Sequence, residues 1–210
     1  MIILVWAYKG AGAPSRDSDL NRAIKIKKIF MSHEIETKIL DVDKNEIIER
    51  IFQLGAQKIK ETRLAVDWYR PIGLKEGEDP WFLRIRSDAY GEHEVTWKAK
   101  SEILGVSRKH KEINFLVQEP QKLADLFKEL SLEKYAHQEK DRISFSFKNY
   151  MFDIDTYPNM PAYLEIESDS EESIKEAIKL LKLEHNRTWE KGERILIQEI
   201  YELDWYNMKF

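Results

Sequence analysis

Short stretches of alternating apolar and polar residues recur along this chain and predict a protein built mostly from β-strands. Side chains two positions apart on a strand point to the same face of a sheet, so each stretch predicts a strand with one apolar and one polar face. The predicted strands occupy residues 33–40, 63–70, 81–87, 93–100, 107–117, 140–148, 150–157 and 162–168.

Three segments between the strands carry the helical spacing of apolar residues. Residues 41–57 predict a helix with Asp43 as its N-cap, and residues 120–132 and 170–183 predict two more. Residues 189–205 are expected to fold back on the body. About eight antiparallel strands can close into a barrel that holds one small ligand. The predicted fold class is therefore α+β: an eight-stranded antiparallel β-barrel, or tunnel, with helices packed outside.

The first 30 residues differ from the rest of the chain. An apolar octet is followed by a turn-like stretch and a short basic segment with helical spacing. Two interpretations stay open: residues 1–30 are an N-terminal extension, with Met31 as the natural start, or they are an arm that docks. Residues 31–210 are predicted to form a single tunnel domain. No stretch approaches the roughly 20 apolar residues of a membrane helix, so a soluble, cytoplasmic protein is expected.

The polar faces of the predicted strands are charged, with like charges two positions apart. The pairs are Glu34/Glu36, Arg84/Arg86, Lys98/Lys100, Lys140/Arg142, Asp153/Asp155 and Glu165/Glu167, and Arg108 and Glu112 lie four apart. The positions between them are largely apolar. If that apolar face lies under helices, the charges face an enclosed space. A buried, unpaired charge costs several kcal/mol, so such a space requires mutual pairing, water or bound ions.

These charges suit a complex of metal and polyphosphate. Arg and Lys bind phosphate oxygens, and clustered carboxylates suit a hard cation such as Mg²⁺ or Mn²⁺. Charged residues reach 34% of the 210 residues, yet the net charge is only −4, which disfavours a general nucleic-acid binder. The chain has no cysteine, which excludes disulfides and thiolate metal sites.

Taken in order, the motifs resemble those of the CYTH, or triphosphate tunnel metalloenzyme, superfamily. Glu34, Glu36 and Lys38 form its Glu-x-Glu-x-Lys signature, and FLRIR, TWKAK, RKHKEI, KDR and DIDTYPNMPAYLEIE follow along the chain. The superfamily includes thiamine triphosphatases, inorganic triphosphatases and class IV adenylate cyclases. The resemblance implies an eight-stranded tunnel that binds triphosphate with Mg²⁺ or Mn²⁺. The chain departs from the motif pattern of the superfamily at Trp68 and Tyr69 and again at Met160 and Pro161. These departures concern the expected tunnel mouth and the choice of substrate.

The resemblance also implies a role for each charged residue. Glu36 and Lys38 are expected to be catalytic, with Lys38 orienting the attacking water or the first carboxylates. The expected phosphate-binding residues are Arg84, Arg86, Lys98, Lys100, Arg108, Lys140 and Arg142. The expected metal ligands or their supports are Glu34, Glu36, Asp155, Glu165 and Glu167. An alternative for Arg108 and Glu112 is a structural role in which they pair only with each other.

The predicted function is a metal-dependent phosphohydrolase of inorganic or organic triphosphate, such as tripolyphosphate, thiamine triphosphate or ATP. A first alternative is a class IV-type adenylate cyclase, in which the ribose hydroxyl attacks the α-phosphate and cyclic AMP forms. A second is a non-catalytic polyphosphate-binding module. A purely structural barrel ranks last because it leaves the inward charges unexplained. Neither a nucleic-acid nor a membrane partner is expected, and the oligomeric state, monomer or homodimer, is open.

Overall fold

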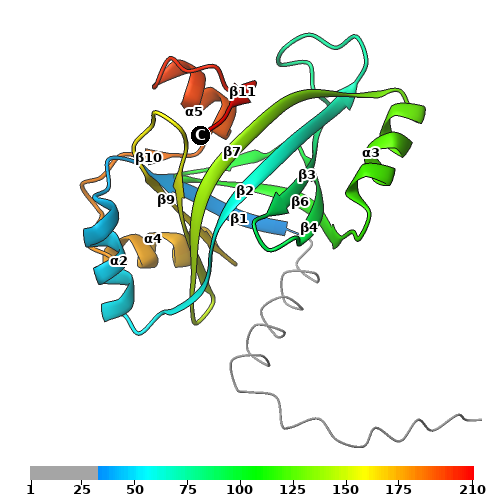
Figure 1. Ribbon diagram of the computed structural model, residues 1–210. Coiled ribbons are helices and arrows are strands. Elements are labelled where there is room, and N and C mark those ends of the chain that lie inside the picture. The colour runs from blue at the N-terminus through cyan, green and yellow to red at the C-terminus, as the bar shows by residue number, and fades with distance from the viewer. Residues whose placement is uncertain (1–32) are drawn as a thin grey trace, which may run out of the picture. The chain divides into compact units, whose positions relative to one another are not determined.

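The computed structural model describes residues 33–210, without the side chains of His33 and Glu34 (Figure 1). The predicted extension at residues 1–30 lies outside the described residues. Eight strands pair antiparallel in the order β1-β9-β8-β7-β2-β3-β4-β6, and β6 pairs again with β1, which closes the barrel. They are β1 (His33–Ile39), β2 (Gln57–Pro71), β3 (Trp81–Asp88), β4 (His93–Ala99), β6 (Ser107–Leu116), β7 (Leu132–Phe147), β8 (Tyr150–Thr156) and β9 (Tyr163–Ser168). The predicted barrel is confirmed.

Three short strands attach to this barrel. They are β5 (Glu102–Leu104) on β6, β10 (Thr188–Trp189) on β1 and β11 (Asn207–Met208) on β7. Only the β11 pairing is parallel. Each has two or three residues, too few to produce a recognisable alternation in the sequence.

The described residues form four α-helices: α2 (Lys44–Gln53), α3 (Pro120–Glu129), α4 (Glu171–Leu180) and α5 (Glu193–Glu199). Asp43 caps α2 as predicted, because its side chain accepts hydrogen bonds from two backbone N–H groups of the first turn at 2.9 Å. The helix predicted at residues 120–132 is too long at its C-terminal end. It stops at Glu129, Ser131 adopts a positive φ of 60°, and Leu132 already begins β7.

The strands β2 and β7 are longer than the sequence pattern indicates. They span 15 and 16 residues and pair along most of their length, with register shifts in β2 at Lys58/Lys60 and Trp68/Tyr69. A register shift moves the following side chains relative to the partner strand, so alternation weakens there. The first half of β7 has polar residues on both faces, so the alternation that would predict a strand is weak there too.

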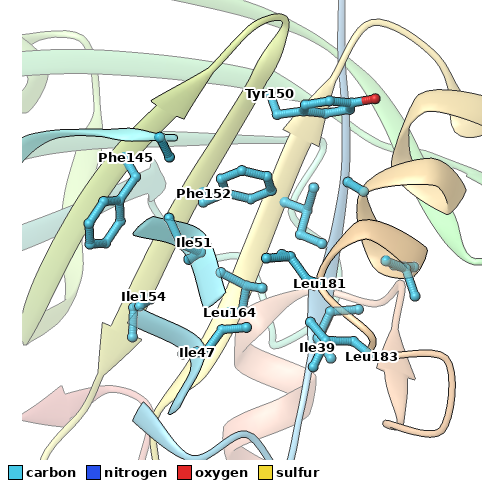
Figure 2. Packing of buried hydrophobic residues seen from close by; sticks show 14 of the residues in the cluster. Ile39, Ile47, Ile51, Phe145, Tyr150, Phe152, Ile154, Leu164, Leu181 and Leu183 are labelled. Carbon is cyan, nitrogen blue, oxygen red and sulfur yellow. The ribbon is translucent and has the colours of Figure 1, made fainter. Parts of the chain in front are cut away.

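Two apolar cores lie on the outer face of the barrel. In the larger core, Ile47 and Ile51 of α2 pack with Phe152, Ile154 and Leu164 of the sheet (Figure 2). Residues of α4 complete this core. In the second, α3 contributes Phe127 against a face of β2, β3 and β4. The helices α2, α3 and α4 therefore pack outside, as predicted.

A third core lies at one end of the barrel. Leu196 and Ile197 of α5 are fully buried there, in one cluster with Leu64 and Val66 of β2. The α5 helix is therefore placed differently from the three outer helices. None of the helices in the described part of the chain has the length and apolar character to cross a bilayer.

Candidate active site

The strand registers bring the predicted charges together on the inner face of the barrel. On β1, Glu36 lies opposite Arg108 of β6 and Glu167 of β9, and Lys38 lies opposite Glu165. Directly opposed residues of antiparallel strands point to the same face. Because the other face of these strands packs under α2 and α4, the charges line the bore.

Three carboxylates form a compact cluster in this bore. One oxygen atom each from Glu36, Glu165 and Glu167 lies within 4.8 Å of the other two. Oxygen ligands at such spacing are those that Mg²⁺ and Mn²⁺ prefer. The donor set therefore fits a hard divalent cation. The backbone of Glu34 pairs with His110, but its side chain lies outside the described residues, so its role as a ligand stays a prediction.

Lys38 lies between two members of this carboxylate cluster. Its Nζ atom is 3.1 Å from Oε1 of Glu36 and 2.9 Å from Oε2 of Glu165, and only 1% of its side chain is exposed. A buried ammonium with two such partners holds both carboxylates in place. The geometry is that of a residue that positions the cluster.

Nearby cations keep the cluster ionised. Burial would raise the pKa of Glu36, but Arg108, followed by Lys38 and Lys98, holds it well below its usual range. Arg108 donates from Nε to Glu36 at 2.8 Å. Burial would likewise raise the pKa of Glu165, but Lys38 and Arg142 together lower it to about 2. Both groups therefore carry a negative charge at neutral pH.

A second charged cluster is centred on Asp155, which is completely buried. It accepts hydrogen bonds from Nε and Nη2 of Arg142, both at 2.6 Å, and from Nζ of Lys140 at 2.8 Å. Arg142 also pairs with Asp153, and with Glu165 at 3.2 Å. Burial would raise the pKa of Asp155, but these two cations hold it well below its usual range. The contacts make Asp155 a partner of cations, and its role as a metal ligand stays a prediction.

The remaining cations lie on β3, β4 and β6. Arg86 pairs with Glu94, and Lys98 pairs with Glu112, each at 2.5 Å. Since Glu112 pairs with Lys98 and Arg108 pairs with Glu36, the alternative in which Arg108 and Glu112 contact only each other is wrong. Lys100 follows the last residue of β4 and is exposed, so it is not gathered with the buried charges.

Arg84 differs from the other cations of the bore. Its guanidinium lies over the ring of Trp68, with its central carbon 5.4 Å from the ring centroid. Its Nε atom is buried without a hydrogen-bond partner, and within the described residues it forms no ion pair. A buried donor without a partner is costly, and an anion in the bore would satisfy it.

Several residues of the bore were not predicted from the sequence. His110 and Glu94 share a strand face with predicted residues, so the same two-residue spacing could have found them. Glu193 of α5 accepts hydrogen bonds from Lys140 at 3.0 Å and from the hydroxyl of Tyr163 at 2.9 Å. No spacing signal marks Glu193, because it reaches the bore from a helix.

Comparisons with known proteins agree with the barrel. No family model matches the chain. A Methanocaldococcus jannaschii protein, provisionally named an adenylate cyclase, is 26% identical over 155 residues, which cover 71% of this chain and 87% of that protein. A Vibrio parahaemolyticus structure with the same provisional name has a TM-score of 0.65 at 12% identity, covering 82% of this chain and 99% of its own.

A further solved structure, from Hippeastrum, is provisionally named an adenylyl cyclase and described as revealing a dominant triphosphatase activity. It has a TM-score of 0.60 at 13% identity, and the match covers 83% of this chain and 98% of that one. At these identities the structures establish the fold. The fold that the resemblance to the CYTH, or triphosphate tunnel, superfamily implies is confirmed.

Proposed function

We propose that this protein is a metal-dependent, triphosphate-processing enzyme that hydrolyses the terminal phosphoanhydride of an inorganic or organic triphosphate. The observation that carries the proposal is the presence, in one bore, of a compact carboxylate trio and an arginine that has no carboxylate partner among the described residues. These are Glu36, Glu165 and Glu167 on one side and Arg84 on the other. A metal–triphosphate complex needs both, because its metal requires oxygen ligands and its phosphates require cations.

The carboxylate trio would hold Mg²⁺ or Mn²⁺. When bound, the ion would neutralise charge on the phosphate oxygens and so act as a Lewis acid. Lys38 would fix the orientation of Glu36 and Glu165 through its two short contacts. Arg84, with Arg86 and other cations of the bore, would bind the phosphate oxygens and hold the triphosphate in position. Positioning and charge neutralisation of this kind account for most of the catalysis of phosphoryl transfer.

A second candidate function is cyclic AMP synthesis from ATP. The names of the Methanocaldococcus and Vibrio proteins favour it, whereas the description of the Hippeastrum structure favours triphosphatase activity. Both reactions would use the same phosphate-binding and metal-binding residues. They differ in which phosphorus atom lies next to the nucleophile. We rank hydrolysis first because it needs no pocket for a base.

The proposal is tested by incubating purified protein with tripolyphosphate, thiamine triphosphate and ATP, each with Mg²⁺ or Mn²⁺. Product identification separates orthophosphate, which hydrolysis releases, from cyclic AMP and pyrophosphate, which the cyclase makes. Activity should stop when a chelator removes the metal. Turnover unaffected by chelation, or no turnover and no binding of any triphosphate, would contradict the proposal.

Arg84→Gln provides the matched test of the phosphate-binding residues. Hydrogen bonds to charged groups contribute about 1.5–3 kcal/mol, so the affinity for tripolyphosphate should fall roughly tenfold to a hundredfold. The control is Arg63→Gln, because Arg63 lies outside the bore, is exposed and pairs with Asp141. Equal affinities for the two variants in titration calorimetry would show that Arg84 does not bind phosphate.

A further inference from the structure

The α5 helix lies beside β11 at one end of the barrel (Figure 1). Leu64 on β2 lies opposite Lys140 on β7, so both point into the bore. Leu64 belongs to the same buried cluster as Leu196 and Ile197 of α5, and the two α5 residues have no exposed surface. A helix packed on residues of the inner face closes that end of the bore. A phosphate chain bound in the bore would meet α5 at that end.

Glu193, the first residue of α5, places a negative charge at this closed end. Its side chain is 14% exposed, and its Oε2 atom is 3.0 Å from Nζ of Lys140. The same ammonium is 2.8 Å from Asp155. Lys140 therefore contacts two carboxylates, of which Asp155 is also paired with Arg142. An arriving phosphate would have to compete with both, and it would be repelled by both.

The charge balance differs at Arg84, which has no carboxylate partner within the described residues. An anion is therefore attracted most strongly where the cation is not yet neutralised, and least where Glu193 and Asp155 surround Lys140. The local charge balance thus favours phosphate beside Arg84 and disfavours it beside Glu193.

We propose that Glu193 is a specificity-determining residue that limits how many phosphate groups the bore accepts. Its carboxylate occupies Lys140 and repels a further phosphate, so a triphosphate chain binds in preference to a tetraphosphate chain. This inference rests on the proposed function, because it assumes that the bore is the binding site for triphosphate. It goes beyond that function by naming the residue that sets the chain length.

Removing the charge at Glu193 should leave α5 in place. The next residue, Arg194, forms an ion pair with the buried Asp79 at 3.3 Å. Leu196 and Ile197 add the apolar anchor. Glutamine at position 193 has nearly the same shape and keeps an oxygen that can accept from Tyr163. The variant Glu193→Gln therefore changes mainly the charge.

The experiment compares the binding of tripolyphosphate and tetrapolyphosphate to the full-length protein by titration calorimetry. The wild type should bind tripolyphosphate more tightly. Glu193→Gln should raise the affinity for tetrapolyphosphate relative to tripolyphosphate about tenfold, since one nearby like charge is removed in a partly screened site. Glu199→Gln is the matched control, because Glu199 carries the same charge on the same helix and is exposed. It should leave the ratio unchanged.

The outcomes separate this inference from the function on which it rests. If no variant binds tripolyphosphate and the protein is folded by circular dichroism, the proposed function fails and the inference fails with it. If tripolyphosphate binds but the ratio in Glu193→Gln equals that of Glu199→Gln, only the inference is overturned. If Glu193→Gln does not fold, the test uses the wild-type protein alone. Equal affinities of the wild type for tripolyphosphate and tetrapolyphosphate overturn the inference.

Discussion

Replacing Asp155 by asparagine tests one of the buried charged clusters of the barrel. Asp155 has no exposed surface and accepts hydrogen bonds from Arg142 and Lys140. Removing one partner of a buried ion pair costs about 3–5 kcal/mol, because the other charge stays buried. Lys140 keeps Glu193 and Arg142 keeps other carboxylates, so we expect the low end, about 3 kcal/mol.

Urea unfolding followed by tryptophan fluorescence measures this loss. With a slope of about 2 kcal/mol per molar urea, the midpoint should fall by about 1.5 M. In a thermal scan the same loss corresponds to about 6–12 °C. The control is Asp141→Asn, because Asp141 is 40% exposed and pairs with Arg63 on the outer face. An exposed pair of this kind contributes less than about 1 kcal/mol.

Equal shifts for Asp155→Asn and Asp141→Asn would refute the reasoning that the buried cluster stabilises the fold. The same variants also address the metal. If Asp155 only holds cations in place, Mn²⁺ should still raise the melting temperature of Asp155→Asn by as much as that of the wild type. Loss of that metal-dependent shift would instead support Asp155 as a ligand.

Two further predictions concern the carboxylate trio. Glu36→Gln removes one of the three clustered carboxylates. It should therefore abolish phosphate release from tripolyphosphate while the circular dichroism spectrum stays native. Near-normal rates would count against a catalytic role for Glu36. The pKa of Glu165 is about 2 in the folded protein and about 4.3 in the unfolded chain. Its contribution to stability is therefore complete above about pH 4.3 and disappears as the pH falls toward 2. Wild-type urea midpoints should therefore drop between about pH 5 and pH 2, and Glu165→Gln should show a smaller drop; identical pH profiles would contradict this assignment.

The inner face of the barrel could be predicted because strand alternation is a local property. Glu36 and Lys38, or Glu165 and Glu167, are two positions apart, and any strand places such pairs on one side. The apolar residues between them, such as Ile166, identify the opposite face as the one that helices cover. Charge pairing between strands is not local. That Arg108 contacts Glu36 follows only from the register of β6 against β1.

Glu193 shows where prediction from sequence stops. It belongs to a short helix whose own pattern indicates only that one side is apolar. Its position in the bore depends on Leu196 and Ile197 packing against β2, more than 100 residues earlier in the chain. Contacts at that separation leave no trace in local spacing. The same is true of Tyr163, which the strand pattern places on the inner face but whose hydrogen bond to Glu193 depends on α5.

The distribution of ion pairs divides the predicted phosphate-binding cations into two groups. Lys140 and Arg142 are nearly buried and already surrounded by carboxylates, so a phosphate that displaced those partners would leave buried anions unpaired. Arg84 requires no such displacement, because its buried Nε has no hydrogen-bond partner within residues 35–210. Binding energy for an anion should therefore be concentrated at Arg84. The cations that form ion pairs with carboxylates stabilise the folded barrel in the absence of ligand.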